Sequence, residues 1–176
     1  DRLAQAGLAP TVLEGGTGLV CDVGEGGPVV VLRADIDALP LQDEKLVPYR
    51  STVDGVCHAC GHDVHTAALV GAALALAQRH AREPLQGRVR MLFQPAEEVM
   101  PGGAHALVEQ GGLNGVSSIF ALHCDPKVDV GFIGTRIGPI TSASTPVPPA
   151  PIPSSRRPEL MSSRPMTSFA NGTGWR

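Results

Sequence analysis

Short apolar runs bounded by glycine or proline alternate with one long Ala- and Leu-rich stretch, and this alternation constrains the fold most strongly. Residues 28–33, Pro-Val-Val-Val-Leu-Arg, are β-branched and apolar, which predicts a buried strand. Residues 65–80 repeat apolar side chains along one helical face, which predicts a helix. Further strands are predicted at 18–23, 88–93 and 118–123, and further helices at 1–6 and 103–110. This alternation predicts an α/β fold with a mostly parallel sheet flanked by helices.

The glycines between the first two predicted strands indicate how these strands are connected. Residues 24–27 read Gly-Glu-Gly-Gly, which predicts a hairpin turn. The segment is not a phosphate-binding loop, because it lacks the Gly-Lys-Ser/Thr ending. A further strand is predicted to begin within residues 130–134.

The composition changes sharply after residue 144. Residues 145–176 hold seven of the sixteen prolines and four of the fourteen basic residues. Within the run 146–153, each proline removes a backbone donor and fixes φ, so neither a helix nor a central strand is expected. We therefore expect one folded domain over residues 1–144 and a disordered Pro/Ser/Arg-rich tail over residues 145–176.

Charge, hydropathy and cysteine content argue against several classes of protein. The net charge of −3 argues against a nucleic-acid binder, which would present a basic face. No apolar run reaches the roughly 18 residues that cross a bilayer, and no secretory signal pattern is found at the start. Four cysteines in 176 residues are too few for a disulfide scaffold. We expect a cytoplasmic protein that binds neither nucleic acid nor membranes.

Polar side chains follow three of the predicted strands, at the point where each strand ends. They are, in chain order, Asp35, Asp37, Glu97, Glu98 and His123. A segment rich in cysteine and histidine, residues 57–65, lies just before the long helix. Because the carboxyl ends of parallel strands meet at one edge of a sheet, we expect these groups to converge there.

The donor types at this edge suit a hydrolytic metal site. The candidate ligands are Cys60, His62, Glu98 and His123. Thiolate, imidazole and carboxylate donors suit zinc and tolerate manganese, cobalt or nickel. The adjacent pair Glu97-Glu98 offers one ligand and one general base. Asp63 or Asp35 is placed to orient a ligand imidazole.

Each of these signals also has a structural explanation. A Glu-Glu pair is commonly a solvated surface, His123 is a lone histidine at a strand end, and two nearby aspartates often cap a turn. Cys57 and Cys60 form a C-x-x-C, which occurs in redox dithiols and in structural zinc sites, although the sequence has no second C-x-x-C. Three hypotheses stay open: a metal hydrolase, a non-catalytic metal-binding fragment and a Cys57/Cys60 thiol redox protein.

Five motifs in a fixed order make the sequence similar to a known family. They are residues 33–40 (Arg-Ala-Asp-Ile-Asp-Ala-Leu-Pro), 58–66 (His-Ala-Cys-Gly-His-Asp-Val-His-Thr), 93–98 (Phe-Gln-Pro-Ala-Glu-Glu), 122–126 (Leu-His-Cys-Asp-Pro) and 131–139 (Gly-Phe-Ile-Gly-Thr-Arg-Ile-Gly-Pro). Together they resemble the metal-dependent amidohydrolases related to hippurate hydrolase, aminoacylase and the auxin-conjugate hydrolases. The resemblance covers residues 1–144.

The resemblance implies hydrolysis of the amide bond of an N-acyl amino acid, a small-molecule substrate, with two divalent ions (Zn, Mn, Co or Ni) in a complete site. It implies that the metal ligands are Cys60, His62, Glu98 and His123. It implies that Glu97 is the catalytic base, which later protonates the leaving amine. Asp35 and Asp37 are implied to be supporting residues, and complete relatives are expected to form homodimers.

The sequence departs from that family at two positions and over one long segment. Cys57 stands where relatives usually carry Met, and Cys124 stands where they carry an aliphatic residue, so two extra thiols lie beside predicted ligands. After residue 144, nothing resembles the inserted domain of relatives or the Gly-Gly-His stretch expected next. We therefore expect a fragment whose residues from 145 onward are read in a wrong frame, with impaired turnover.

Overall fold

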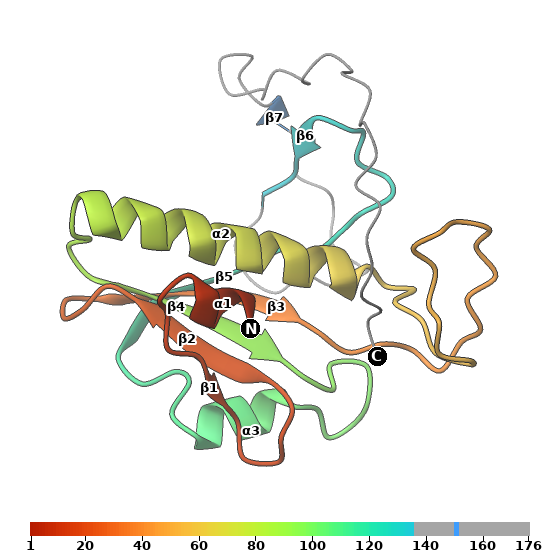
Figure 1. The fold of residues 1–176 in the computed structure, drawn as a ribbon, viewed down its shortest axis with the longest axis horizontal. Coiled ribbons are helices and arrows are strands. Elements are labelled where there is room, and N and C mark those ends of the chain that lie inside the picture. The colour runs from red at the N-terminus through yellow and green to blue at the C-terminus, as the bar shows by residue number, and fades with distance from the viewer. Residues whose placement is uncertain (136–149, 152–176) are drawn as a thin grey trace, which may run out of the picture. The chain divides into compact units, whose positions relative to one another are not determined.

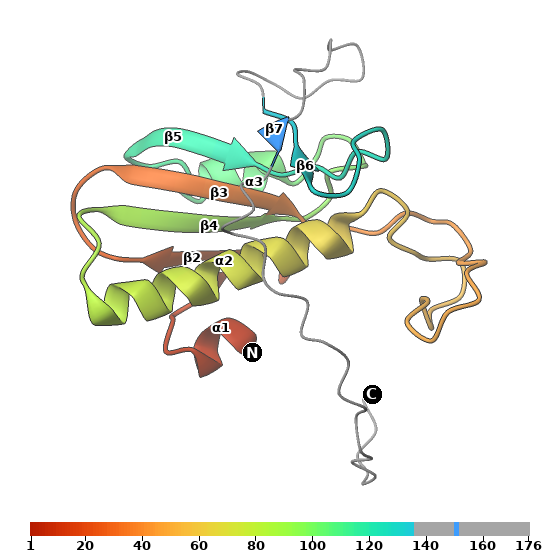
Figure 2. The same cartoon turned by 90° about the horizontal axis from the view of Figure 1, so that it is seen from above.

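The computed structural model describes residues 1–135 and 150–151. The chain divides into two compact units, Asp1–Cys124 and Asp125–Arg176. The first unit holds a five-stranded sheet and three helices, α1 (Arg2–Gln5), α2 (His62–Arg82) and α3 (Ala104–Glu109) (Figures 1 and 2). These helices overlap the three predicted helices, so the predicted α/β class is confirmed.

The sheet is mixed. Its strands are β1 (Thr11–Val12), β2 (Leu19–Val23), β3 (Val29–Asp35), β4 (Arg88–Gln94) and β5 (Val116–Ala121). Their order across the sheet is β1-β2-β4-β3-β5. β3 runs parallel to both β4 and β5, whereas β2 runs antiparallel to both β1 and β4. The parallel arrangement therefore belongs to the three strands that end in the polar residues.

The glycine-rich turn between β2 and β3 does not close a hairpin, contrary to the prediction. β4 lies between these two strands and pairs with both of them. The turn packs instead on the segment that precedes β4, since a Cβ on Gly24 would lie 2.3 Å from the carbonyl oxygen of Gly87. The local pattern predicts a turn correctly, but it carries no information about a strand inserted from much later in the chain.

Helix α2 begins at His62, before the predicted start at residue 65. Gly61 precedes it in the left-handed conformation, with φ of 88°, which glycine adopts without a Cβ penalty. The helix ends at Arg82, just before Pro84, which has no amide hydrogen with which to continue it. This start places His62 and His65 on the buried stripe of the helix, in line with Leu69 and Ala73.

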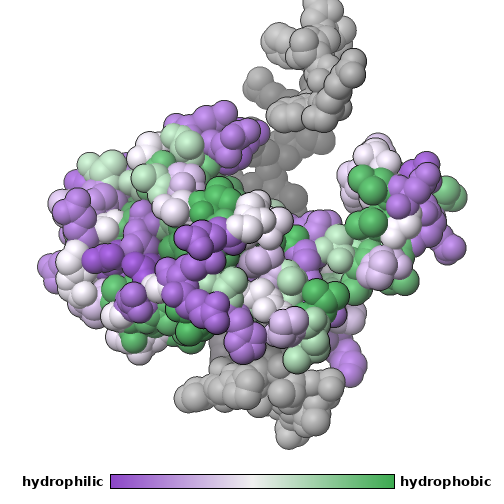
Figure 3. Space-filling view, turned by 90° about the horizontal axis from the view of Figure 1, so that it is seen from below, coloured by the Kyte–Doolittle hydropathy of each residue, from purple (hydrophilic) through white to green (hydrophobic). Residues whose placement is uncertain are grey.

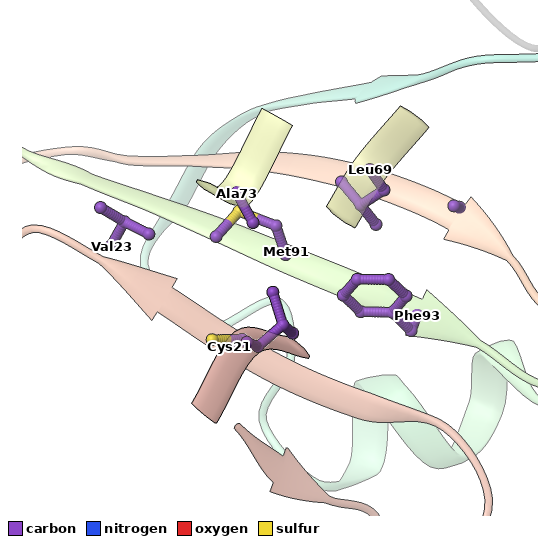
Figure 4. Close-up of a cluster of buried hydrophobic side chains, with 8 residues drawn as sticks. Cys21, Val23, Leu69, Ala73, Met91 and Phe93 are labelled. Atoms are coloured by element: carbon purple, nitrogen blue, oxygen red, sulfur yellow. The ribbon is translucent and has the colours of Figure 1, made fainter. Parts of the chain in front are cut away.

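Helices α2 and α3 lie on opposite faces of the sheet (Figure 1). Each helix contributes to an apolar cluster between itself and the sheet. In the first cluster, Leu69 and Ala73 of α2 pack toward Met91 and Phe93 of β4 (Figure 4). The second cluster contains Leu13, Val31, Leu92 and Leu107. Because successive side chains of β4 point to opposite faces, both clusters fix its register, and the turn after Gln94 is held in place.

The edge strand β5 and the loop between β3 and α2 leave apolar side chains exposed. In β5, the exposed fractions of Ile119 and Phe120 are 54% and 61%. The loop is closed at its base by a bridge between Leu39 and Cys57, and it carries Leu46, which is 96% exposed. Figure 3 shows this loop as a projection with both hydrophobic and hydrophilic surface.

In the second unit, β6 (Phe132–Ile133) pairs antiparallel with β7 (Ala150–Pro151). The strand predicted within residues 130–134 is thus confirmed over two residues. Apart from residues 150–151, the predicted tail 145–176 and the predicted boundary at residue 144 lie outside the described residues. Within residues 1–135 and 150–151, no helix has the length and apolar character that a membrane span requires.

Candidate metal centre

The start of α2 and the turn after β4 bring three candidate donors together. Cys60, His62 and Glu98 each offer a ligand atom, and these atoms lie within 4.8 Å of one another. His123, which follows β5, adjoins this group, because its Nε2 lies 3.6 Å from the Sγ of Cys60. All four candidate ligands from the sequence therefore occupy one edge of the sheet.

His62 is the most deeply buried of these donors, with a side chain 1% exposed. Its Nδ1 lies 3.0 Å from the carbonyl oxygen and 3.1 Å from a carboxylate oxygen of Asp37, so Nδ1 carries the hydrogen of the neutral ring. The buried Nε2 is left with a lone pair and has no hydrogen-bond partner among the described residues.

Three carboxylates surround this unpartnered nitrogen. The His62 Nε2 lies 3.7 Å from a carboxylate oxygen of Asp35, 3.9 Å from one of Glu97 and 3.8 Å from one of Glu98. Carboxylates and an imidazole lone pair cannot hydrogen-bond to one another without an added proton. A divalent cation would bind the lone pair of Nε2 and balance the negative charge of the carboxylates around it, so these residues fit a metal ion.

The turn that carries Glu97 and Glu98 is held by close backbone packing. Ala96 adopts a positive φ of 50°, which is uncommon for a residue other than glycine. A Cβ on Gly103 would lie 2.1 Å from the carbonyl oxygen of Pro95, so only glycine permits this approach. The backbone N–H of Gly103 also donates to the carbonyl of Ala96 at 3.0 Å.

Charge and burial set the protonation of Cys60 and Asp35 in opposite directions. Burial, together with the neighbouring Glu98, raises the pKa of the Cys60 thiol to about 11. Burial also disfavours the ionised form of Asp35, but the hydrogen bond from His65 and the nearby Arg33 outweigh it and hold the pKa of that carboxyl below its ordinary value. Without a cation the thiol is therefore protonated at neutral pH, and a bound cation would favour the thiolate.

The predicted supporting residues differ in their contacts. Asp37 orients His62, and Asp35 lies against His62 and accepts a hydrogen bond from His65 at 2.6 Å. Asp63 lies in the first turn of α2 with an exposed side chain, and none of the described hydrogen bonds joins it to an imidazole. The orienting role that the sequence offered to Asp63 or Asp35 is thus taken for His62 by Asp37.

His65 is a buried site residue that the sequence analysis does not select. Its ring lies 5.4 Å from that of His62 and 4.9 Å from that of His123, between centroids. The sequence feature that could have identified His65 is its three-residue spacing from His62, which places both side chains on one helix face. That signal appears only once the helix is known to begin at residue 62.

The C-x-x-C cysteines have different surroundings. Cys57 is buried beside the bridge to Leu39, whereas Cys60 is partly exposed and faces His123. Both are free thiols in the structure, as are Cys21 and Cys124. Cys60 therefore lies among metal-type donors, while the surroundings of Cys57 are those of a core residue.

Comparison with known proteins places these features in a family. Residues 31–172 match peptidase family M20/M25/M40. N-acetylcysteine deacetylase of Bacillus subtilis (strain 168) is 50% identical over 129 residues, which are 72% of this chain and 33% of that protein. The crystal structure of the Bacillus subtilis YXEP protein, described as a dinuclear metal-binding peptidase from the M20 family, aligns with a TM-score of 0.71 and 46% identity, over 79% of this chain and 39% of that chain.

A longer protein shares the same segment. A Rhodococcus jostii (strain RHA1) protein with the provisional name glutamate–cysteine ligase 2-3 is 54% identical over 145 residues, which are 82% of this chain and 18% of that protein. The chain thus spans a third or less of the length of these curated relatives. The resemblance based on the five motifs is confirmed at the level of the family. The chain belongs to peptidase family M20/M25/M40.

Proposed function

We propose that this protein hydrolyses the amide bond of N-acyl amino acids with the help of two divalent cations. One observation carries the proposal: the buried Nε2 of His62 lacks a hydrogen-bond partner among the described residues and lies among three carboxylates. Relatives named N-acetylcysteine deacetylase and N-acyl-L-amino acid amidohydrolase support the substrate class.

The positions of the donors suggest how two cations are shared. Cys60 belongs to the close group with His62 and Glu98, and it is also the neighbour of His123. We infer that Cys60, His62, Glu98 and His123 would hold the cations, with the Cys60 sulfur near both the His62–Glu98 pair and His123. Cations bound there would act as Lewis acids toward the scissile carbonyl and the attacking water.

Glu97 is the proposed general base. Its side chain is 40% exposed, against 26% for Glu98, and the backbone of Glu98 is fixed by a hydrogen bond to Asp37. The freer carboxylate of Glu97 takes a proton from water as the water oxygen bonds to the carbonyl carbon. When the C–N bond breaks, Glu97 gives that proton to the amine nitrogen, which leaves a carboxylic acid and a free amino acid. The carboxylic acid then loses the second proton of the water to solvent and becomes a carboxylate.

The test separates the base from the ligands. Glu97→Gln keeps the shape of the side chain but cannot take a proton, so hydrolysis of N-acetyl-L-cysteine should fall by about 100- to 10,000-fold. Metal content, measured by elemental analysis, should stay at the wild-type level. Glu109→Gln on the outside of α3 is the matched control and should change neither quantity.

The outcomes distinguish the proposal from its alternatives. Wild-type rates in Glu97→Gln would show that Glu97 is not the base. Bound cations with no hydrolysis of any N-acyl amino acid by the wild type would favour a non-catalytic metal-binding fragment. A dithiothreitol-sensitive disulfide between Cys57 and Cys60 in a metal-free native protein would favour the thiol redox alternative.

A further inference from the structure

His65 is a fully buried imidazole, 1% exposed, that the proposed reaction does not use. It lies between the rings of two proposed ligands, His62 and His123. Together with Asp35 and His62 it also forms a second group whose ligand atoms lie within 4.8 Å of one another. The question is whether His65 binds a cation itself or places the residues that do.

The hydrogen bonds of His65 occupy both of its ring nitrogens. The backbone N–H of Cys124 lies 2.8 Å from Nε2. A backbone N–H can only donate, so Nε2 must offer its lone pair. The hydrogen of the neutral ring is then on Nδ1, which donates to the Asp35 carboxylate at 2.6 Å.

Both carboxylate oxygens of Asp35 already have partners. One carboxylate oxygen accepts from His65, and the other pairs with the Arg33 guanidinium at 2.6 Å. A cation on the Nε2 of His65 would have to displace the N–H of Cys124 and break this hydrogen bond, which is costly in a partly buried setting. The contacts therefore argue against His65 as a ligand, despite the closeness of the three side chains.

The peptide that His65 holds also orients a proposed ligand. The Nδ1 of His123 lies 2.7 Å from the carbonyl oxygen of Cys124, so Nδ1 donates and Nε2 keeps its lone pair. That Nε2 faces the Cys60 sulfur at 3.6 Å. The backbone of Cys124 is thus held through its N–H by His65 and in turn fixes the ring of His123 through its carbonyl.

We propose that His65 is a positioning residue that acts through the backbone of Cys124 to set the tautomer and direction of His123 for metal binding. Asp35 and Arg33 hold His65 in the tautomer that this role needs. The inference rests on the proposed function, because the direction of the His123 lone pair matters only if a cation binds to it.

The first experiment measures Co²⁺ binding by absorption titration, in which the thiolate of Cys60 and the imidazoles give distinct bands. In His65→Leu the acceptor for the Cys124 N–H is lost, and the dissociation constant of the Co²⁺ that His123 binds should rise about 10- to 100-fold. His65→Gln keeps both an acceptor and a donor at the end of a similar side chain and should restore most of this affinity.

The matched control lies on the same helix. His80 also accepts a backbone N–H, that of Leu85 at 3.1 Å, but at the far end of α2. His80→Leu removes an equivalent hydrogen bond, so a purely structural effect on the helix should appear in both Leu variants. We expect the Co²⁺ that His123 binds to have the same dissociation constant in His80→Leu as in the wild type.

A second measurement does not depend on any variant folding. Long-range ¹H–¹⁵N spectra of the metal-free wild type should show hydrogen on Nδ1, and none on Nε2, for both His65 and His123. Hydrogen on the Nε2 of His65, or equal Co²⁺ binding by the wild type and His65→Leu, would overturn this role alone. Absence of Co²⁺ binding by the wild type would overturn the proposed function as well.

Discussion

Asp37 and His62 are joined by a carboxylate–imidazole contact of 3.1 Å that also fixes the neighbouring turn. The second carboxylate oxygen of Asp37 accepts the backbone N–H of Glu98 at 2.9 Å. One side chain thus sets the ring of one proposed ligand and the backbone of another. This carboxylate thus links two donors from separate elements, α2 and the turn after β4.

Replacing Asp37 with Ala is therefore expected to weaken metal binding. His62 loses the carboxylate, one of the two acceptors of its Nδ1 hydrogen, and keeps only the backbone carbonyl of residue 37. Glu98 loses a backbone partner, so the Zn²⁺ dissociation constant should rise about 10- to 100-fold. Competition with a chromophoric chelator measures this constant. Asp37→Asn keeps one carbonyl acceptor and should fall between Ala and the wild type, while Asp54→Asn in the exposed loop serves as the control. Unchanged affinity in Asp37→Ala would contradict the assigned role.

Gly103 tests whether the position of the Glu97-Glu98 turn matters. A methyl group at this position meets the Pro95 carbonyl oxygen at 2.1 Å, so Gly103→Ala must push the turn away and should cost about 1–3 kcal/mol of unfolding free energy. The displaced turn should also bind Zn²⁺ more weakly. Urea denaturation and chelator competition measure the two effects, and wild-type values for both would show that the turn tolerates the shift.

Gly71 lies in α2 and is the matched control for the change at Gly103. Here alanine is expected to stabilise the protein rather than destabilise it. A Cβ there meets nothing within 4 Å, and the backbone is already helical. Gly71→Ala should raise the free energy of unfolding by about 0.5–1 kcal/mol, because alanine loses less backbone entropy than glycine on folding. Zn²⁺ affinity should not change, and destabilisation by this variant would contradict the structure around α2.

The elements that follow from the sequence are those whose side chains face the core. The strand at Val29–Asp35 and the helix at His62–Arg82 have apolar patterns that burial enforces, so their positions are predicted to within a few residues. β1, which has only two residues, is not predicted, since it exists only through pairing with β2. β5 lies at Val116–Ala121 rather than at 118–123. Only Val116 packs against a core cluster and the remaining five residues are exposed at the sheet edge, so burial leaves no apolar pattern that marks the end of the strand.

The candidate site was predictable to a similar extent. The donors Cys60, His62, Glu98 and His123 follow from the rule that strand ends converge, but their partners do not. Asp37 contacts His62, whereas Asp35 accepts a hydrogen bond from His65, and His65 in turn accepts one from the backbone of Cys124. These contacts depend on side-chain geometry that sequence spacing does not encode. The cytoplasmic location and the homodimer stay predictions, because the described residues do not test them.

A partly buried ion pair away from the site makes stability depend on pH. Arg90 donates to Asp22 at 2.8 and 2.9 Å and to the backbone carbonyls of Gly111, Gly112 and Asn114. Burial opposes the charge on Asp22, but the hydrogen bonds from Arg90 and Arg88 outweigh it and hold the pKa of the carboxyl below its ordinary value. In acid the unfolded chain therefore binds this proton before the folded chain does.

Asp22→Asn should accordingly lower the free energy of unfolding at neutral pH and change it little in acid. The Asp22 side chain is 29% exposed, so solvent screens part of the interaction, and we expect a loss of about 1–2 kcal/mol at pH 7. The stabilisation is fully present above the unfolded pKa of about 4 and is lost as the pH falls through the folded pKa, so the two proteins should converge. Urea denaturation from pH 7 to pH 2.5 measures the difference, with the exposed Glu25→Gln as control. A difference between the wild type and Asp22→Asn that stays constant across this range would show that the charge on Asp22 does not carry the stabilisation.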